Sequence, residues 1–323
     1  MTTTLMPPSQ EVLTDCVRLA TAAPSLHNSQ PWLFRIGPSA IDVYADRNRR
    51  LPVLDPAGRE QLISVGAALF TLRLAMRRAG YRTEARLFPE PGEARLVARV
   101  VPVGVEPPNA ASEALAEAVP HRHTNRWPFA HTPVPPEALE HLRDAGRREG
   151  AVLTVANPAS RDAILELART AEDRLRGRPG YRAELARWTG GLGRRDGVPA
   201  WAAGPWDALE SIPVRDFAAY VPLPHRQEPF EPYPTILVLA TAGDGRPDWV
   251  RAGQALQRVL LTATWLNLAT TPISQPVEVP ALRQMLVDPT GGLSAQMVLR
   301  VGYGKAMGAT PRRPVEDVLL PAR

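Results

Sequence analysis

The sequence predicts an α+β fold built from two tandem units, each with an antiparallel-rich sheet flanked by helices. Along the whole chain, apolar residues recur at helical spacing in some segments and at strand spacing in others. A length of 323 residues is sufficient for two packed units. One segment also occurs twice, because GAAL at 66–69 recurs as GQAL at 253–256 inside two long apolar stretches. We therefore expect a first unit over 1–106 and a second over 107–323.

The first unit is expected to contain two helices and three strands. Apolar residues at helical spacing predict the first helix, and Pro24 ends it because proline cannot continue a helix. Two runs of β-forming residues on either side of a Gly37-Pro38 turn predict a hairpin. In chain order we expect a helix over 11–23, strands over 32–36 and 41–44, a helix over 56–80 and a strand over 95–103.

The second unit should begin near Ser112, after a linker that starts at Pro107-Pro108. Pro135 and Pro136 are well placed to begin a helix, and Ser160 is well placed as a helix N-cap. We expect helices over 112–119, 137–150, 160–176 and 246–268, strands over 152–155, 235–240 and 297–301, an irregular segment over 177–227, and a mostly extended tail over 302–323.

Glycine inside each of the two long helices needs an explanation. It costs ~1 kcal/mol relative to alanine. Close approach of the two helices, as at a pseudo-twofold axis, would account for Gly66 and Gly253. In both copies a proline-containing loop and then a strand follow the helix. The alternative is a chance similarity between two amphipathic helices.

Composition excludes several classes of protein. The net charge is +5 and the pI about 9.8, but the arginines are spread among Asp and Glu and do not form the clusters of a nucleic-acid-binding surface. No apolar run approaches the ~20 residues that span a bilayer, and the N-terminus lacks a signal-peptide pattern. The single cysteine, Cys16, excludes an intrachain disulfide and should lie in the core. We expect a cytoplasmic protein with no nucleic-acid or membrane partner.

Three short segments carry residues suited to binding a phosphorylated cofactor. Residues 24–32 read PSLHNSQPW and connect the first helix to the first strand. Arg122, Thr124 and Arg126 alternate along an extended segment, so two guanidinium groups and a hydroxyl can face one phosphate. The tail adds a second basic pair, Arg312 and Arg313. Residues 121–131 also hold three histidines, but no cysteine joins them, and we predict no metal site.

Together these segments resemble the FMN-binding motifs of the nitroreductase family, and nearly the whole chain resembles its Acg-type branch. In that family an Arg-x-Ser/Thr-x-Arg/Lys segment and a C-terminal basic pair bind the FMN phosphate. A Pro-Ser-x-x-Asn-x-Gln-Pro-Trp segment lines the flavin of the partner subunit. The resemblance implies FMN contacts from Pro24, Ser25, Leu26, Asn28, Arg122, His123, Thr124, Arg126, Arg312 and Arg313, with Gln30 and Trp32 supporting the turn and the core.

Two further segments match the family less closely. Residues 271–275, TPISQ, correspond to a loop whose backbone N–H groups face flavin O4 and N5, which implies contacts from Pro272, Ile273, Ser274 and Gln275. Many family members carry a carboxylate where Ser274 stands. Arg182, or alternatively Arg187, lies where the family contacts the flavin pyrimidine. Plain alternatives are an ordinary loop for 271–275 and a charged helix face for the two arginines.

The order of the motifs predicts a fused pseudo-dimer with one FMN per chain. The first unit keeps the PSLHNSQPW segment but has no phosphate-binding segment before it, and the second unit shows the reverse. A pseudo-dimeric monomer is therefore expected, with a homodimer as the alternative. Residues 177–227 are long, irregular and rich in Gly, Pro and Trp, and we interpret them as a lid over the flavin.

The expected activity is that of an FMN-dependent oxidoreductase. NAD(P)H would pass a hydride to flavin N5, and the reduced flavin would pass electrons to a nitroaromatic, a quinone or another small organic acceptor. No side chain is an obligatory catalyst, because the cofactor carries the chemistry. Two alternatives remain open: a flavin-sequestering protein with a lid and little turnover, and a flavin oxidase or dehydrogenase of a biosynthetic intermediate. The sequence carries no NAD(P) fingerprint.

Overall fold

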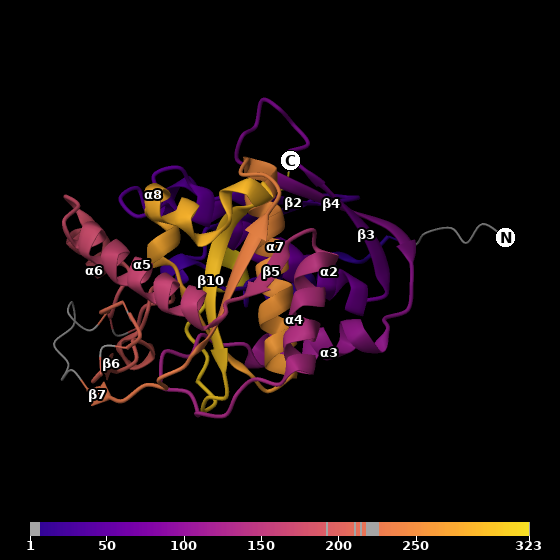
Figure 1. The fold of residues 1–323 in the computed structure, drawn as a ribbon. Helices are drawn as coiled ribbons and strands as arrows, with labels where there is room; N and C mark the ends of the chain where they lie inside the picture. The colour runs from indigo at the N-terminus through magenta and orange to yellow at the C-terminus, as the bar shows by residue number, and fades with distance from the viewer. Residues whose placement is uncertain (1–6, 192, 210, 214, 218–225, 323) are drawn as a thin grey trace.

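Two four-stranded antiparallel sheets, one in each half of the chain, organise the structure (Figure 1). The structure is a computed structural model, and it describes residues 7–322 except 192, 210, 214 and 218–225. A third, two-stranded parallel sheet pairs β6 (Trp206–Asp207) with β7 (Gln227–Glu228). The predicted α+β class with two antiparallel sheets is confirmed.

The first sheet has the strand order β1-β2-β4-β3, and every neighbouring pair is antiparallel. The long helix of this half, α2, packs against the sheet and against α1. The elements are α1 (Gln10–Ala20), β1 (Trp32–Ile36), β2 (Ile41–Ala45), α2 (Arg59–Arg78), β3 (Tyr81–Leu87) and β4 (Leu96–Val105).

The second sheet has the strand order β5-β8-β10-β9, again antiparallel throughout. Its long helix, α7, contacts β8, β9 and β10. The elements are α3 (Ala110–Ala118), α4 (Pro136–Arg148), β5 (Val152–Val155), α5 (Pro158–Arg176), α6 (Tyr181–Arg187), β8 (Thr235–Thr241), α7 (Arg246–Trp265), β9 (Ala269–Ile273), α8 (Pro280–Arg283) and β10 (Ser294–Gly302).

The two halves repeat one topology. The chain order α1-β1-β2-α2-β3-β4 of the first half recurs in the second as α4-β5-β8-α7-β9-β10, and the two sheets place equivalent strands in the same order. The second half differs by the insertion between β5 and β8, which contains α5, α6 and the β6–β7 pair. The repeat predicted from residues 66–69 and 253–256 therefore extends to whole sheets.

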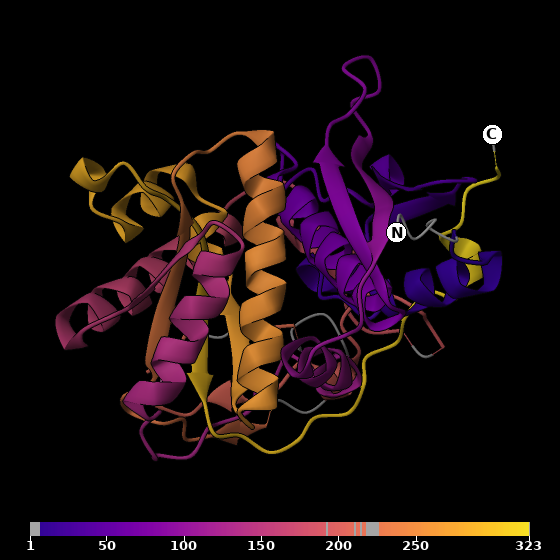
Figure 2. The same cartoon turned by 90° about the vertical axis from the view of Figure 1, so that its right-hand side faces the viewer.

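The helices α2 and α7 cross in van der Waals contact at two glycines (Figure 2). A Cβ atom added to Gly66 would lie 2.2 Å from the carbonyl oxygen of Val250, and one added to Gly253 would lie 2.0 Å from the carbonyl oxygen of Ile63. Both distances are shorter than any real contact, so only glycine fits at either position. The close approach expected from the two helical glycines is confirmed.

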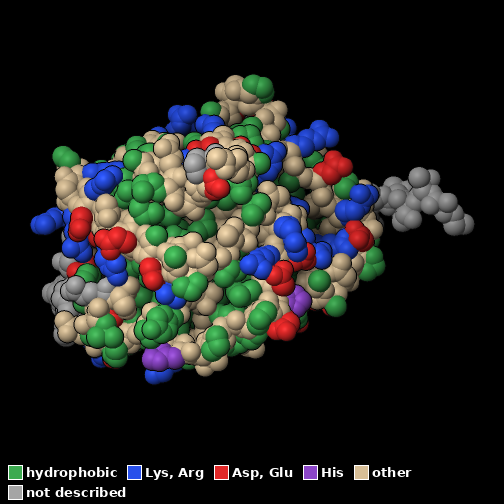
Figure 3. Space-filling model, in the orientation of Figure 1, with side chains coloured by type: hydrophobic (Ala, Val, Ile, Leu, Met, Phe, Trp, Pro, Cys, Tyr) green, Lys and Arg blue, Asp and Glu red, His purple; other side chains and the backbone are tan. Residues whose placement is uncertain are grey.

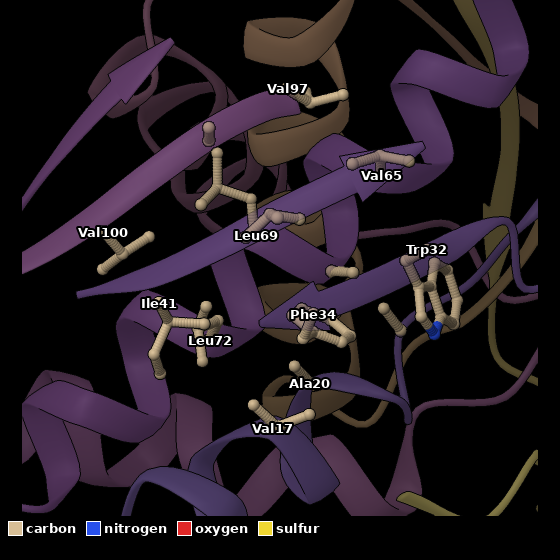
Figure 4. Close-up of a cluster of buried hydrophobic side chains, with 14 of the residues drawn as sticks. Val17, Ala20, Trp32, Phe34, Ile41, Val65, Leu69, Leu72, Val97 and Val100 are labelled. Atoms are coloured by element: carbon tan, nitrogen blue, oxygen red, sulfur yellow. The ribbon is translucent and has the colours of Figure 1, made fainter. Parts of the chain in front are cut away.

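The first half has its own apolar core between α1, α2 and the sheet (Figure 4). Trp32 and Phe34 of β1 are fully buried, and they lie beside Leu69 and Leu72 of α2 and Val17 of α1. Cys16 is also buried, and burial together with Asp15 raises the pKa of its thiol to about 12. The expected core positions of Trp32 and Cys16 are confirmed.

Several predicted elements need correction. The prediction missed β3 and β9, which are both edge strands of the four-stranded sheets, and it missed α6 and the β6–β7 pair in a segment expected to be irregular. The strand β3 does alternate, but its inward-facing Thr83 and Ala85 are only weakly apolar and give a faint signal. Pro272 in β9 is tolerated because an edge strand needs fewer backbone donors. Asn157, not Ser160, caps α5, because the Asn157 side chain accepts from the backbone N–H of Ser160. The first helix ends at Ala20, three residues earlier than expected.

The C-terminal tail returns to the first half of the molecule. It is mostly extended, as predicted, and it reaches the edge strand β1 (Figure 2). The backbone N–H of Phe34 donates to Val318 O over 2.8 Å, and Leu320 N–H donates to Phe34 O over 2.7 Å. The tail of the second predicted unit therefore packs on the first unit, which the boundary at 106/107 does not anticipate.

Charges are mixed on the molecular surface. On the face in Figure 3, arginines lie among aspartates and glutamates and do not form a continuous basic area. Surface ion pairs such as Arg143–Glu140 and Arg148–Asp144 account for part of this pattern. Within the described residues no helix is both long enough and apolar enough to cross a membrane.

Candidate functional site

A pocket with about 940 Å³ of empty space, partly open to solvent, lies between the two halves. The first half contributes residues of the PSLHNSQPW turn and of α2, and the second half contributes residues of α7, β9 and β10. The lining residues are Pro24, Ser25, Leu26, His27, Glu60, Ile63, Ser64, Ala67, Thr124, Arg126, Ile212, Pro213, Arg215, Phe217, Leu256, Leu260, Thr271, Pro272, Ile273, Ser274, Gln275, Met297 and Arg300.

The PSLHNSQPW turn has an unusual backbone. His27, Asn28 and Gln30 have φ angles of 47°, 54° and 51°, in the left-handed region that non-glycine residues seldom adopt. Local hydrogen bonds hold this conformation, since the Ser25 hydroxyl accepts from Gln30 N–H and the Gln30 side chain donates to Arg195 O. Concentrated backbone strain of this kind is typical of functional sites. The expected supporting role of Gln30 is confirmed.

Two buried arginines lie together beside this turn without an acidic partner. Arg122 and Arg312 both donate to the carbonyl oxygen of Ala22, and the Nε atom of each is buried with no hydrogen-bond partner within the described chain. Burial and mutual repulsion lower the pKa of Arg122 to about 9, and burial lowers that of Arg312 to about 10. No carboxylate of the described residues lies within 4 Å of either guanidinium. Two buried, uncompensated cations form a site for an anion such as a phosphate.

Asn28 and Arg313 have different roles from those predicted. Asn28 does not line the pocket; its Oδ1 accepts from Arg312 Nη1 over 2.9 Å and so positions that guanidinium. Arg313 is directed away from Arg312, donates to Gln30 O and Asp317 O, and lies 3.8 Å from Asp46. Only one arginine of the tail pair therefore reaches the anion site.

The predicted clamp of Arg122, Thr124 and Arg126 is not assembled as a single group. Thr124 and Arg126 line the pocket, whereas Arg122 lies with Arg312. Arg126 donates to Ala202 O and stacks over the Phe217 ring at 4.8 Å. The two arginines have different partners, because the Ala202 carbonyl and the Phe217 ring hold Arg126 whereas Arg122 donates to Ala22 O. His123 is half-buried near Arg122, and burial lowers its pKa to about 4.

The segment 271–275 lies on the pocket wall, as expected from its resemblance to the family loop. All five residues line the pocket. The segment is the end of edge strand β9 followed by a 3₁₀ turn, whereas the sequence suggested a loop. Strand pairing of β9 with β10 and the hydrogen bond from the Thr271 hydroxyl to Asn125 O fix its position.

Arg215 lines the pocket, whereas the predicted Arg182 and its alternative Arg187 do not. Arg182 and Arg187 are exposed on α6. Arg215 is buried, donates to Glu278 Oε2 over 2.6 Å, and lies 2.9 Å from His27 Nε2. Burial and the neighbouring cations lower the pKa of His27 well below its usual value, so the imidazole is neutral. No sequence pattern identifies Arg215, because it lies in an irregular segment.

Two more charged residues of the pocket were not predicted. Arg300 forms a bidentate ion pair with Glu231, at 2.6 Å for each bond, and its guanidinium lies over the rings of Phe129 and Phe230. Glu60, near the start of α2, is the second. The sequence analysis did not identify either residue, because the role of each depends on its burial in the folded chain. Among the described residues, no group of three or more His, Cys, Asp and Glu side chains could hold a metal ion.

The fold and the pocket define a protein of two repeated α+β halves with a pocket between them. The Nitroreductase family model matches residues 119–303, and full-length relatives extend the similarity over nearly the whole chain. The chain belongs to the nitroreductase family.

Two relatives come from Mycobacterium tuberculosis. "Putative NAD(P)H nitroreductase Rv3131" is 33% identical over 97% of this chain and 92% of its own length. "Putative NAD(P)H nitroreductase acg" is 31% identical over 95% of both chains. Among solved structures, the FMN-dependent nitroreductase NfnB from Mycobacterium smegmatis, in complex with NADPH, is 17% identical. That match covers 66% of this chain and 99% of NfnB, with a TM-score of 0.40.

Proposed function

We propose that the protein is an FMN-binding, NAD(P)H-dependent oxidoreductase that reduces a small organic acceptor. The observation that carries the proposal is the buried pair Arg122 and Arg312 beside the PSLHNSQPW turn. A phosphate with close to two negative charges would supply the missing partner for both guanidiniums. The names of the relatives, which refer to NAD(P)H and nitroreduction, agree with this assignment.

The residues present fit the cofactor. Arg122 and Arg312 would hold the phosphate, with Asn28 fixing the orientation of Arg312. Apolar side chains of the central helices, Ile63 and Leu256, would form a flat wall for the isoalloxazine ring. When bound, the flavin supplies hydride transfer at N5, and the chain's own residues orient the ring, exclude water and neutralise the phosphate.

We further propose one FMN in each chain. In the repeat register that aligns Gly66 with Gly253, the pocket residues Ala67 and Leu260 correspond to Gln254 and Arg73. These two side chains are hydrogen-bonded to each other over 2.7 Å. They therefore fill the pseudo-symmetric position where a second pocket would lie.

Glu149 occupies the same pseudo-symmetric position as Arg73 and Gln254. The connection between α4 and β5 is short, and it stands where the first half has the PSLHNSQPW turn. The Glu149 carboxylate accepts from Arg73 over 2.9 Å and from Arg258 over 2.8 Å. Loss of the second site supports a pseudo-dimeric monomer built from units 1–106 and 107–323, with the tail exchanged onto the first.

A flavin-sequestering role is the second candidate. The predicted lid, 177–227, lies partly outside the described residues, but Ile212, Pro213, Arg215 and Phe217 line the pocket. These residues cover part of the space that an acceptor needs. An oxidase or dehydrogenase of a biosynthetic intermediate would use the same pocket with a different electron donor.

Anaerobic mixing of the FMN-loaded protein with NADPH or NADH distinguishes these candidates. A reductase should lose its flavin absorbance within seconds, because hydride transfer needs only access of the nicotinamide to N5. The matched control is free FMN at the same concentration. A flavin that stays oxidised with both donors would contradict the reductase assignment and favour sequestration or an oxidase.

A further inference from the structure

Glu60 is a carboxyl group inside the pocket with no role in the assignment above. It is the second residue of α2, is only 3% exposed, and lines the pocket. Its Oε1 atom accepts from Arg59 Nη2 over 2.7 Å. The other oxygen, Oε2, is buried and has no hydrogen-bond partner within the described chain. A buried, unpartnered carboxyl oxygen on a pocket wall is available to a ligand.

Arg59 fixes the position of Glu60 in the pocket. Besides the bond to Glu60, its guanidinium donates to Gln296 O over 2.8 Å and to Val277 O over 3.3 Å. These bonds tie the start of α2 to the segment that follows Ser274, a residue of the same pocket. Glu60 is thus held by rigid neighbours, as a group that must meet a reacting atom requires.

The charges around Glu60 favour its neutral form. Removal from water and the nearby Glu278 raise its pKa well above the usual value, and Asp55 adds to this. Arg59 and Arg215 oppose the shift, as does the N-terminal end of α2. Arg215 is already engaged by Glu278 over 2.6 Å, and this reduces its effect on Glu60. Burial is the largest of these contributions, and a neutral carboxylic acid has a proton to donate from Oε2.

We propose that Glu60 is the general acid of the pocket. This inference rests on the proposed oxidoreductase function and assigns the residue that supplies the proton to the acceptor. A bound flavin, reduced by NAD(P)H, would supply the hydride and Glu60 Oε2 would supply one proton, so that an acceptor such as a neutral quinone would leave as the hydroquinone. The carboxylate of Glu60 then regains a proton from water when the product leaves the partly open pocket.

The first test reads the proton on Glu60 directly and needs no flavin. Infrared spectra of the flavin-free protein at neutral pH should show the C=O band of a protonated carboxylic acid, and Glu60→Gln should remove it. Glu137→Gln is the matched control, because Glu137 is also the second residue of its helix, α4, but is exposed. A band that persists in Glu60→Gln, or that is absent from the wild type, overturns the proposal.

The second test reads proton transfer in the loaded protein, with menadione as the neutral quinone. Reoxidation of the reduced flavin by menadione should slow by about 100-fold in Glu60→Gln, a typical loss for a general acid, while reduction by NADPH changes little. An unchanged reoxidation rate overturns the proposal. If the protein binds no FMN but shows the infrared band, both the proposed function and this role of Glu60 are contradicted. If the protein binds FMN but lacks the band, only the role of Glu60 is contradicted.

The protonated state also predicts a pH dependence of stability. The folded chain holds the Glu60 proton at pH values where the unfolded chain releases it, so the folded state binds more protons. The free energy of unfolding should therefore fall as pH rises from the ordinary glutamate pKa towards the raised value. Denaturant titrations of Glu60→Gln should lack this decrease, and Glu137→Gln should retain it. Parallel curves for wild type and Glu60→Gln would contradict a raised pKa.

Discussion

Replacing Arg122 with methionine should weaken FMN binding by at least about 30-fold and, at the same time, stabilise the flavin-free protein. Loss of one charged partner of a buried ion pair costs about 2–5 kcal/mol of binding free energy. Without the cofactor the Arg122 charge is uncompensated, since its one hydrogen bond runs to Ala22 O and its Nε is unpartnered. Removing such a charge in favour of an apolar side chain of similar length should raise the free energy of unfolding by about 1 kcal/mol.

Arg313→Met is the matched control for this experiment. Arg313 belongs to the same predicted basic pair as Arg312, but it is bonded to Gln30 O and Asp317 O, away from the anion site. Its replacement should change FMN affinity only a few-fold. Affinity is measured by quenching of flavin fluorescence on binding to the apoprotein, and stability by urea titration. Equal losses of affinity in both variants would show that the phosphate lies elsewhere.

Gly253→Ala should unfold the protein or destabilise it by about 3 kcal/mol or more. The added methyl group would lie 2.0 Å from Ile63 O and 2.9 Å from Gly66 Cα, and backbone atoms of a packed helix cannot move aside as a flexible side chain can. The same substitution at Gly66 meets Val250 O at 2.2 Å. Because the pocket lies between α2 and α7, separation of these helices should also lower FMN affinity.

Gly146→Ala provides the control for a helical glycine with room around it. Gly146 is inside α4, and a Cβ there would meet its nearest neighbours at 3.5 Å, an ordinary contact distance. Helix propensity alone then favours alanine by ~1 kcal/mol. Thermal unfolding of the three variants tests the helix crossing. Equal behaviour of Gly253→Ala and Gly146→Ala would mean that α2 and α7 do not approach as described.

The sequence was sufficient for the repeated architecture because the relevant signals are local. Helical spacing, turn residues and the two glycines predicted α2, α7 and their close contact, and the structure confirms them. The unpredicted strand β3 alternates, but small or polar residues such as Thr83 and Ala85 on its inward side make the apolar signal faint. The strand β9 contains a proline, a residue that local reasoning assigns to loops.

The residues of the pocket were predicted only in part, because many of them come together only through tertiary contacts. The predicted residues that do line it are Pro24, Ser25, Leu26 and the segment 271–275. These residues directly follow or end predicted helices and strands, and those elements fix their positions. Arg215 and Glu60 were missed, because their roles depend on burial and on Glu278, which is distant in the sequence. Glu278 forms an ion pair with Arg215, 63 residues away, and repels the carboxylate of Glu60, 218 residues away. The separation of Arg122 from Arg126 likewise depends on tertiary contacts that spacing does not reveal.

The most direct test of the account is the amount of FMN that one chain binds. The apoprotein is titrated with FMN while its mass in solution is measured by sedimentation. We predict saturation at one FMN per chain in a monomer, because the Arg122–Arg312 pair lies beside the PSLHNSQPW turn of the first half and the pseudo-symmetric position is filled by Arg73, Glu149 and Gln254. Saturation at two FMN per chain would contradict the filled second site, and no binding would contradict the flavin pocket itself.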